Sequence, residues 1–281
     1  MAVTLHGCAV RSLALDGAAD ALAQQGQQAE DDLQLAHEAS AFYLKVSESL
    51  LQERPQHLKL AESVSAGFTQ YAYAFVTLEA DKREAVSSQQ AQQLRERAAK
   101  LYRRAQRHAM AALELSSPGF AKALASQDAR QWPHLKSEQV GLAYWAAASW
   151  GSWIASSKDD PDVVADLPQA IRLATLAWAV TPAWGQGSLA SLMGTFESVR
   201  PGGSSTQAAV YFDRAIALGG EQNAGAWVAR AESLALPAQQ REDFEHDLRQ
   251  ALVVCQKFPT LQNQAMQARA TWLLSISDDL F

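Results

Sequence analysis

The chain has 281 residues, 48% of them hydrophobic, and a formal net charge of -6. This length is enough to bury a core without disulfides, and the acidic balance argues against a nucleic-acid partner, because phosphate binding needs a concentrated excess of Lys and Arg. Cys8 and Cys255 stand at opposite ends of the chain, so neither a disulfide framework nor a four-ligand zinc site is indicated.

The N-terminal residues predict a lipid anchor. Leu5-His6-Gly7-Cys8 is similar to the end of a bacterial lipoprotein signal, in which a small residue precedes the lipidated Cys. The positive and hydrophobic regions that normally precede such a Cys are missing here, so we expect the natural gene product to begin upstream of Met1. An ordinary Cys in a frayed tail is the alternative. We predict a tether over residues 1–29 and one helical-repeat domain over residues 30–281.

Long helices are expected next. Two of them, Leu58–Glu79 and Gln90–Leu115, would be joined by a charged turn at Asp81–Glu84. The connection that follows, Gly119–Ser137, is predicted to be a long loop with a short helix. Long connections in a compact repeat protein are often functional or cover a site.

Two stretches without charge follow this connection. Gln139–Ser157 approaches the length of a membrane span, but it contains one Leu, one Val and one Ile, the residues that drive insertion. Its aromatic residues surround most of a helix, which must therefore be buried on nearly every side. The second stretch, Leu173–Phe196, is broken by Pro182, Gly185 and Gly187. The two stretches predict helices that lie inside the protein or line an apolar cavity.

Small and aromatic residues recur at spacings of 4 and 3, most clearly in Ser205–Leu218, as in the second helix of a tetratricopeptide repeat. Equivalent anchors at Ala177, Ala215 and Ala251 are 38 and 36 residues apart, close to the usual repeat of about 34. We predict an all-α protein of about four tetratricopeptide-like helix pairs with N- and C-terminal capping helices. The residues expected between helices are Ala170, Ala174, Ala177, Ala208, Phe212, Ala215 and Ala251.

No motif for catalysis or metal binding stands out. The six His never form a pair at metal-ligand spacing, and no Gly-x-Ser-x-Gly elbow is present. Gly202-Gly203-Ser204-Ser205 lacks the Lys of a phosphate-binding loop. We therefore predict no enzyme, no cofactor and no metal site. An enzyme that uses His134 with a nearby acid is the weakest alternative.

Several segments in order along the chain resemble the T component associated with TRAP transporters, a family of bacterial periplasmic lipoproteins. They are Ser65 to Val76 (SAGFTQYAYAFV), Pro118-Gly119-Phe120, Tyr144-Trp145, Trp150 to Ile154 (WGSWI), Ser157 to Pro161 (SKDDP), Gly202-Gly203, Tyr211 to Ala215 (YFDRA) and Asp278 to Phe281 (DDLF). Together they cover nearly the whole chain.

The resemblance implies a non-catalytic binding or scaffold protein with tetratricopeptide-like helix pairs around an apolar channel or cleft. It implies docking of the transporter's substrate-binding P component, homo-oligomers with a trimer as the first expectation, and a periplasmic location with membrane attachment through lipidated Cys8 alone. A generic tetratricopeptide adaptor without a ligand cavity is the alternative.

A small hydrophobic or amphipathic molecule is favoured as ligand over a bare dicarboxylate, which would need several Arg or Lys to offset its desolvation. Plain core packing is the simpler explanation for many of the aromatic residues, but such numbers of Tyr and Trp are costly in a dry core unless their polar tips find partners. The candidate ligand-binding residues are Phe68, Tyr71, Tyr73, Tyr144, Trp145, Trp150, Trp153, Trp178 and Trp184.

Overall fold

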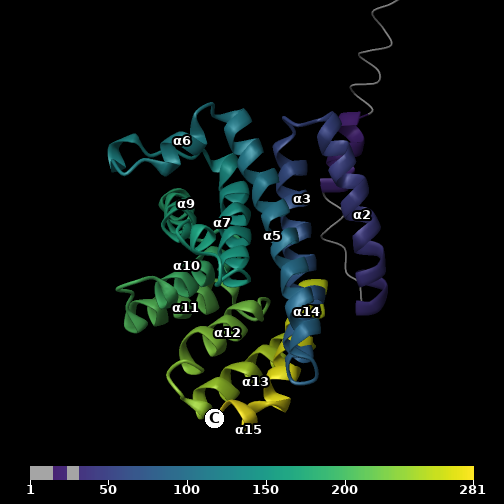
Figure 1. Ribbon diagram of the computed structural model, residues 1–281, viewed down its shortest axis with the longest axis vertical. Helices are drawn as coiled ribbons and strands as arrows, with labels where there is room; N and C mark the ends of the chain where they lie inside the picture. The colour runs from purple at the N-terminus through teal and green to yellow at the C-terminus, as the bar shows by residue number, and fades with distance from the viewer. Residues whose placement is uncertain (1–14, 24–31) are drawn as a thin grey trace, which may run out of the picture.

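The computed structural model describes residues 15–23 and 32–281, which form helices joined by turns and loops (Figure 1). No strand occurs in these ranges, and the predicted all-α class is confirmed. The elements after the helical residues 15–23 are α2 (Leu33–Glu53), α3 (Leu58–Tyr71), the π-helical turn η1 (Ala72–Thr77), α4 (Leu78–Glu84), α5 (Ser88–Ser116), α6 (Phe120–Ala125), the short 3-10 turns η2 (Ala129–Gln131) and η3 (Ser137–Gln139), α7 (Val140–Ala155), α8 (Pro161–Val164), α9 (Leu167–Val180), α10 (Ser188–Val199), α11 (Ser205–Gly219), α12 (Gly225–Arg230), the π-helical turn η4 (Ala231–Ala235), α13 (Arg241–Lys257), α14 (Leu261–Ser275) and α15 (Ser277–Leu280).

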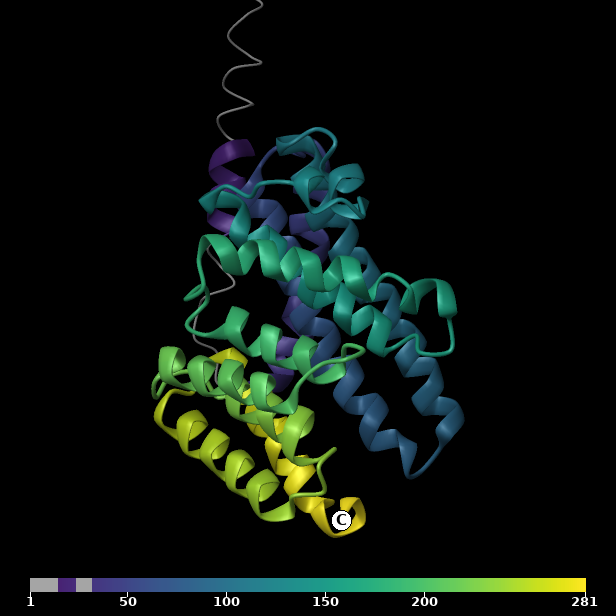
Figure 2. The ribbon, with the colours of Figure 1, turned by 90° about the vertical axis from the view of Figure 1, so that its left-hand side faces the viewer.

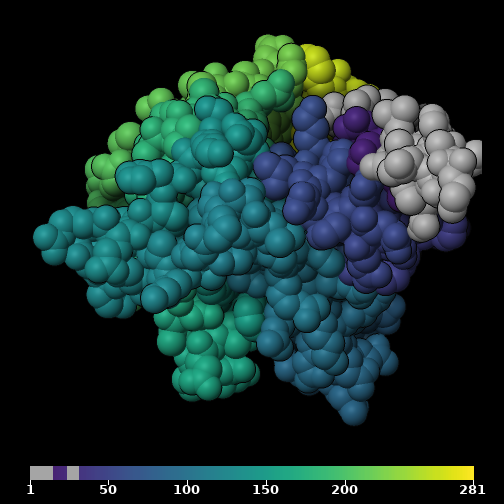
Figure 3. Space-filling view, turned by 90° about the horizontal axis from the view of Figure 1, so that it is seen from above, coloured from purple at the N-terminus to yellow at the C-terminus, as the bar shows by residue number. Residues whose placement is uncertain are grey.

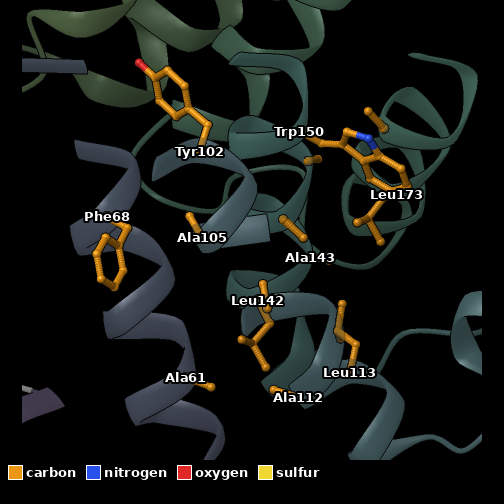
Figure 4. Packing of buried hydrophobic residues seen from close by; sticks show 14 of the residues in the cluster. Ala61, Phe68, Tyr102, Ala105, Ala112, Leu113, Leu142, Ala143, Trp150 and Leu173 are labelled. Carbon is orange, nitrogen blue, oxygen red and sulfur yellow. The ribbon is translucent and has the colours of Figure 1, made fainter. Parts of the chain in front are cut away.

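The N-terminal half is built around α5, which packs against α3 on one side and α7 on the other. Small residues make this close approach possible. Ala105 and Ala112 of α5 and Ala143 of α7 are almost completely buried where the helices meet (Figure 4). The next layer is α9, which packs against α7. The uncharged stretch predicted to lie inside the protein is thus the middle helix of this half.

Helices α10 to α14 form the lower part of the molecule in Figure 2, where α10 packs on α11 and α13 packs on α14. The residues predicted to lie between helices are all 0% exposed, so this prediction is confirmed: Ala170, Ala174, Ala177, Ala208, Phe212, Ala215 and Ala251. The tetratricopeptide-like pairing of the helices stays a prediction.

Helix α14, near the C-terminus, returns to the N-terminal half. Arg269 of α14 donates hydrogen bonds to Asp81 of α4 at 2.6 Å and to Glu232 of η4 at 2.5 Å. Its guanidinium also lies 5.8 Å from the ring centre of Tyr73 in η1. One buried cation therefore holds three separate helical segments together.

The prediction of a charged turn at Asp81–Glu84 is wrong. Residues 58–84 form one continuous helical run, and the chain turns at residues 85–87 instead. The charges stabilise this run, because Arg83 pairs with Glu79 one turn earlier at 2.7 Å and Asp81 pairs with Arg269. A cluster of charges without Gly or Pro is therefore poor evidence for a turn.

A second buried charge joins α2 to α5. The Glu48 side chain is 3% exposed, and its carboxylate accepts hydrogen bonds from Lys45 at 2.5 Å, Arg104 at 2.5 Å and His108 at 2.8 Å. Burial by itself would raise the pKa of Glu48, but these three donors outweigh it and hold the pKa at about 2. Glu48 is therefore a charged anchor within the helix layer.

Residues 15–23, which sequence analysis placed in the tether, pack on the turn between α2 and α3. Ala19 is 0% exposed, Asp16 pairs with Arg54 at 2.8 Å, and Tyr43 donates to the carbonyl of Leu22. The boundary at residue 29 stays a prediction, and Cys8 lies outside the described residues. Figure 3 shows this helical segment in purple at one side of the molecule, with the segment around α6 projecting at the other.

One helical stretch in the described part of the chain, Pro161–Val180, is long and apolar enough to cross a membrane by length and composition. The stretch comprises α8 and α9. This criterion is weak evidence on its own, because core helices of water-soluble proteins also meet it.

Candidate functional site

The beginning of α7 is fixed by a buried amide. Gln139 is 1% exposed, and its side-chain nitrogen donates to the hydroxyls of Ser116 at 2.9 Å and Ser117 at 3.0 Å. Its side-chain oxygen accepts from the backbone N–H of Lys136 at 2.9 Å. The amide therefore ties the start of α7 to the end of α5, and the first turn of α7 lies in a defined position beside α3.

Gly141, in this first turn, faces the side chain of Glu62 on α3. A side chain at position 141 would overlap the Glu62 carboxylate. The missing Cβ thus leaves room for the carboxylate to lie against the backbone of α7.

Glu62 lies in this space without a partner. Its carboxylate makes no hydrogen bond or ion pair with any residue that the structure describes, and burial raises its pKa. Lys59, one turn earlier on α3, is exposed and does not pair with it. An unpaired and partly desolvated carboxylate costs free energy, because lost hydration is not replaced. The structure keeps this group where a charged or hydrogen-bonding partner could reach it.

Glu62 borders an open pocket of about 480 Å³. The pocket lies between the first turns of α3 and α7, the helical residues 15–23 and the turn before α10. The residues that shape it include Asp20, His57, Glu62, Glu138, Gly141 and Trp184. His57 lies 3.4 Å from Asp20. The other ionisable residues that line the pocket are Glu62, Glu138 and Lys59, so three carboxylates stand against one Lys there.

Trp184 is placed by an unusual turn. Gly185, Gln186 and Gly187 follow it with φ angles of 62°, 49° and 89°, a left-handed conformation that is costly for Gln186. At Gly187 a side chain would overlap the carbonyl of Ala215 on α11. The carbonyl of Gln186 accepts from Asn223 at 3.1 Å. The turn is therefore held by α11 and by the segment after it, and it fixes the indole at the pocket.

Behind Trp184 lie two more of the predicted aromatic residues. The ring centre of Trp184 is 4.3 Å from that of Tyr144 and 6.5 Å from that of Trp145. Burial raises the pKa of Tyr144 to about 12, although a hydrogen bond with Ser188 opposes this shift. These residues come from α7 and from the turn before α10, so the two uncharged stretches do meet at one aromatic cluster.

The other six predicted site residues lie elsewhere. Phe68 packs beside His108 and Arg104, Tyr71 is hydrogen bonded to His37 at 3.0 Å, and Tyr73 lies near Arg269. Trp153 packs on Arg103, whereas Trp178 packs on Tyr211 and Arg214. Trp150 is 6% exposed beside Leu173 (Figure 4), and its indole N–H has no hydrogen-bond partner among the described residues.

Of the nine candidates, only Trp184 lines the pocket. Sequence reasoning missed Glu62 and Gly141, because one acid on a polar helix face and one Gly in an Ala-rich helix are ordinary by themselves. The available signal was the uncharged α7, whose Gly141 stands where a neighbouring helix comes close. Within residues 15–23 and 32–281, no group of three or more His, Cys, Asp or Glu side chains is arranged to hold a metal ion.

Comparison with known proteins agrees with the resemblance that the sequence suggested. The family model described as TRAP transporter T-component matches residues 29–281. An uncharacterized protein of Treponema pallidum (strain Nichols) is 26% identical over 263 residues, which make up 90% of this chain and 81% of that protein.

Proposed function

The chain belongs to the TRAP transporter T-component family, and we propose that it serves such a transporter as a non-catalytic binding and scaffold protein. In this proposal it docks the substrate-binding P component and admits a small hydrophobic or amphipathic molecule to the pocket beside Trp184.

The observation that carries the ligand part of the proposal is the meeting of the two uncharged stretches at one pocket. Gly141 comes from the first stretch and Trp184 from the second, and both line the same space of about 480 Å³. Trp184 gives this space an aromatic wall supported by Tyr144. Ligand pockets typically combine such apolar walls with a few polar groups.

Docking is tested with the purified chain and the P component encoded with it. We expect a complex in sedimentation velocity, and we expect the complex to survive Trp184→Ala, since docking uses a surface beside the pocket. Two independent sedimenting species at concentrations up to 100-fold above those in the periplasm would contradict the docking part. The same runs give the oligomeric state, for which a trimer is proposed.

Ligand binding is tested by mass spectrometry of organic extracts from the purified protein. We expect a small organic molecule in extracts of the parent and less of it in extracts of Trp184→Ala. Should neither protein release a molecule while docking persists, the alternative of a generic adaptor without a ligand cavity is favoured. The burial of Trp150 and Phe68, which leaves neither side chain open to a ligand, favours that alternative.

The anchor is also proposed: the protein is periplasmic and attached to the membrane through lipidated Cys8. Two or more acyl chains give durable attachment, whereas one chain gives only marginal binding. The test is to express the gene with its upstream region, with and without Cys8→Ser, and to fractionate the cells. Equal membrane retention of the two forms would exclude Cys8 as the anchor.

A further inference from the structure

The pocket has a charge pattern that restricts its ligand. It is lined by the indole of Trp184 and by the Glu62 carboxylate, which has no partner in the described part of the chain. The exposed Glu138 and Asp20 also line it, and the carboxylate of Asp20 lies 3.4 Å from the His57 ring nitrogen. Among the described residues that line the pocket, Lys59 is the one Lys or Arg, and it forms no ion pair with Glu62 although it lies one helical turn away.

We propose that the pocket binds an organic ammonium ion with an apolar body, its cationic head placed between the Glu62 carboxylate and Trp184. The inference rests on the proposed ligand-binding function and names the chemical class of the ligand.

An aromatic face attracts a cation through its quadrupole, and the attraction is stronger where water is excluded. A carboxylate beside that face adds direct charge pairing. A carboxylate ligand would be repelled by Glu62 and Glu138, and Lys59 is the one exposed cation that the described lining residues offer it. A neutral ligand would leave Glu62 unpaired, with the desolvation of its charge uncompensated.

Gly141 adds a geometric argument. The carboxylate of Glu62 lies where a side chain at position 141 would be, so the missing side chain leaves room for the carboxylate against α7. The position of the charge thus depends on the missing side chain. Glycine at this position and glutamate at position 62 act together in the proposed site.

The test compares three probes built on straight chains of eight carbons, the carboxylate carbon of octanoate included: octyltrimethylammonium, octanoate and 1-octanol. Titration calorimetry of the full chain at pH 7.5 is expected to give an affinity for the ammonium at least tenfold above that for the other two. Glu62→Gln keeps the side-chain shape and removes the charge, so it should weaken ammonium binding about tenfold and leave octanol binding nearly unchanged. Gly141→Ala should weaken ammonium binding in the same direction, because it displaces the carboxylate.

Glu96→Gln serves as the charge-matched control, since Glu96 is exposed on α5 and does not line the pocket. It should leave all three affinities within twofold. Octanoate bound as tightly as the ammonium, or ammonium binding indifferent to Glu62→Gln, would overturn the inference. If the three probes bind equally and Trp184→Ala abolishes their binding, the proposed ligand pocket stands and its preference for cations does not. If no probe binds, the proposed ligand pocket and its preference for cations are both wrong. Docking of the P component is tested by its own experiment.

Discussion

Two glutamates on neighbouring helices occupy opposite electrostatic situations. Glu48 of α2 is buried against α5 and accepts hydrogen bonds from Lys45, Arg104 and His108. Glu62 of α3 faces α7 and has no partner in the described part of the chain. Burial raises the pKa of Glu62, whereas the donors around Glu48 hold its pKa at about 2. The same residue type is thus an anchor at one helix contact and a partly desolvated group, without a partner among the described residues, at the other.

The difference distinguishes a carboxylate that stabilises the fold from one that lowers its stability. A buried carboxylate that is fully paired contributes to the helix layer, and removing it leaves cations without a partner. A carboxylate that is kept without a partner lowers stability, so its presence points to a use outside the folding of the chain. The comparison therefore predicts opposite responses to the same substitution.

The largest effect is expected for Glu48→Gln. The substitution leaves the half-buried Arg104 and His108 beside a neutral amide at a buried position, and breaking such a pair costs about 3 kcal/mol of unfolding free energy. Urea unfolding followed by circular dichroism measures it. Glu38→Gln, at an exposed site on the same helix, is the control and should change stability by less than about 0.5 kcal/mol. A loss below 1 kcal/mol for Glu48→Gln would show that the cluster is not the anchor described here.

Acid should remove the stabilisation by the Glu48 carboxylate from the parent protein, because it protonates this group. The folded pKa of Glu48 is about 2, below the ordinary value of 4.5, so its stabilisation is fully present above pH 4.5 and is lost as pH falls towards 2. The difference between the parent and Glu48→Gln should shrink from about 3 kcal/mol at pH 7 to less than half of that near pH 2. Glu245 also has a pKa of about 2, but it titrates in both proteins and cancels in this difference. A difference that stays constant over this range would contradict the assignment.

Sequence patterns predicted the helix packing better than the site. The frame of small residues around Phe212 and Ala215 identifies buried positions, because close helix contacts require small side chains at regular spacings wherever they occur. Aromatic residues carry less information, since either a core or a pocket can accommodate them. Trp150 and Trp153 lie one turn apart on α7, yet one is packed beside Leu173 and the other against Arg103.

The site depends on contacts between distant segments, which periodicity does not encode. Trp184 reaches the pocket because the turn that follows it takes three consecutive left-handed residues, held from α11 and beyond. Glu62 has no partner among residues 15–23 and 32–281, because no Lys or Arg in these ranges reaches its carboxylate. Both facts concern the relative placement of helices, so the nine aromatic candidates yielded one pocket residue.

Glu62→Gln should change the free energy of unfolding in the opposite direction from Glu48→Gln, and by a smaller amount. Because burial raises the folded pKa of Glu62, the protein binds this proton more tightly when folded, and stability falls as pH rises from the unfolded pKa through the folded one. Removing the charge should therefore stabilise the protein at pH 7 by up to about 1 kcal/mol. The gain should vanish near pH 4, where the parent side chain is protonated. Thermal unfolding at both values measures it, and a loss of stability at pH 7 would mean that Glu62 is paired after all.

The smallest effect is expected for Gly141→Ala, which tests whether the Glu62 side chain is free to move. Alanine favours a helix over glycine by up to about 1 kcal/mol, while the new methyl group must displace the Glu62 carboxylate. The displaced group is the flexible end of a side chain with no hydrogen bond to lose, so the two effects should nearly cancel, to within about 0.5 kcal/mol.

Gly194→Ala is the matched comparison, because its methyl group would press on the ring of Phe212, which is 0% exposed and has no room to shift. That variant should lose about 1–3 kcal/mol. If Gly141→Ala loses as much as Gly194→Ala in the same urea series, Glu62 is locked in place like Glu48, and the contrast between the two carboxylates does not hold.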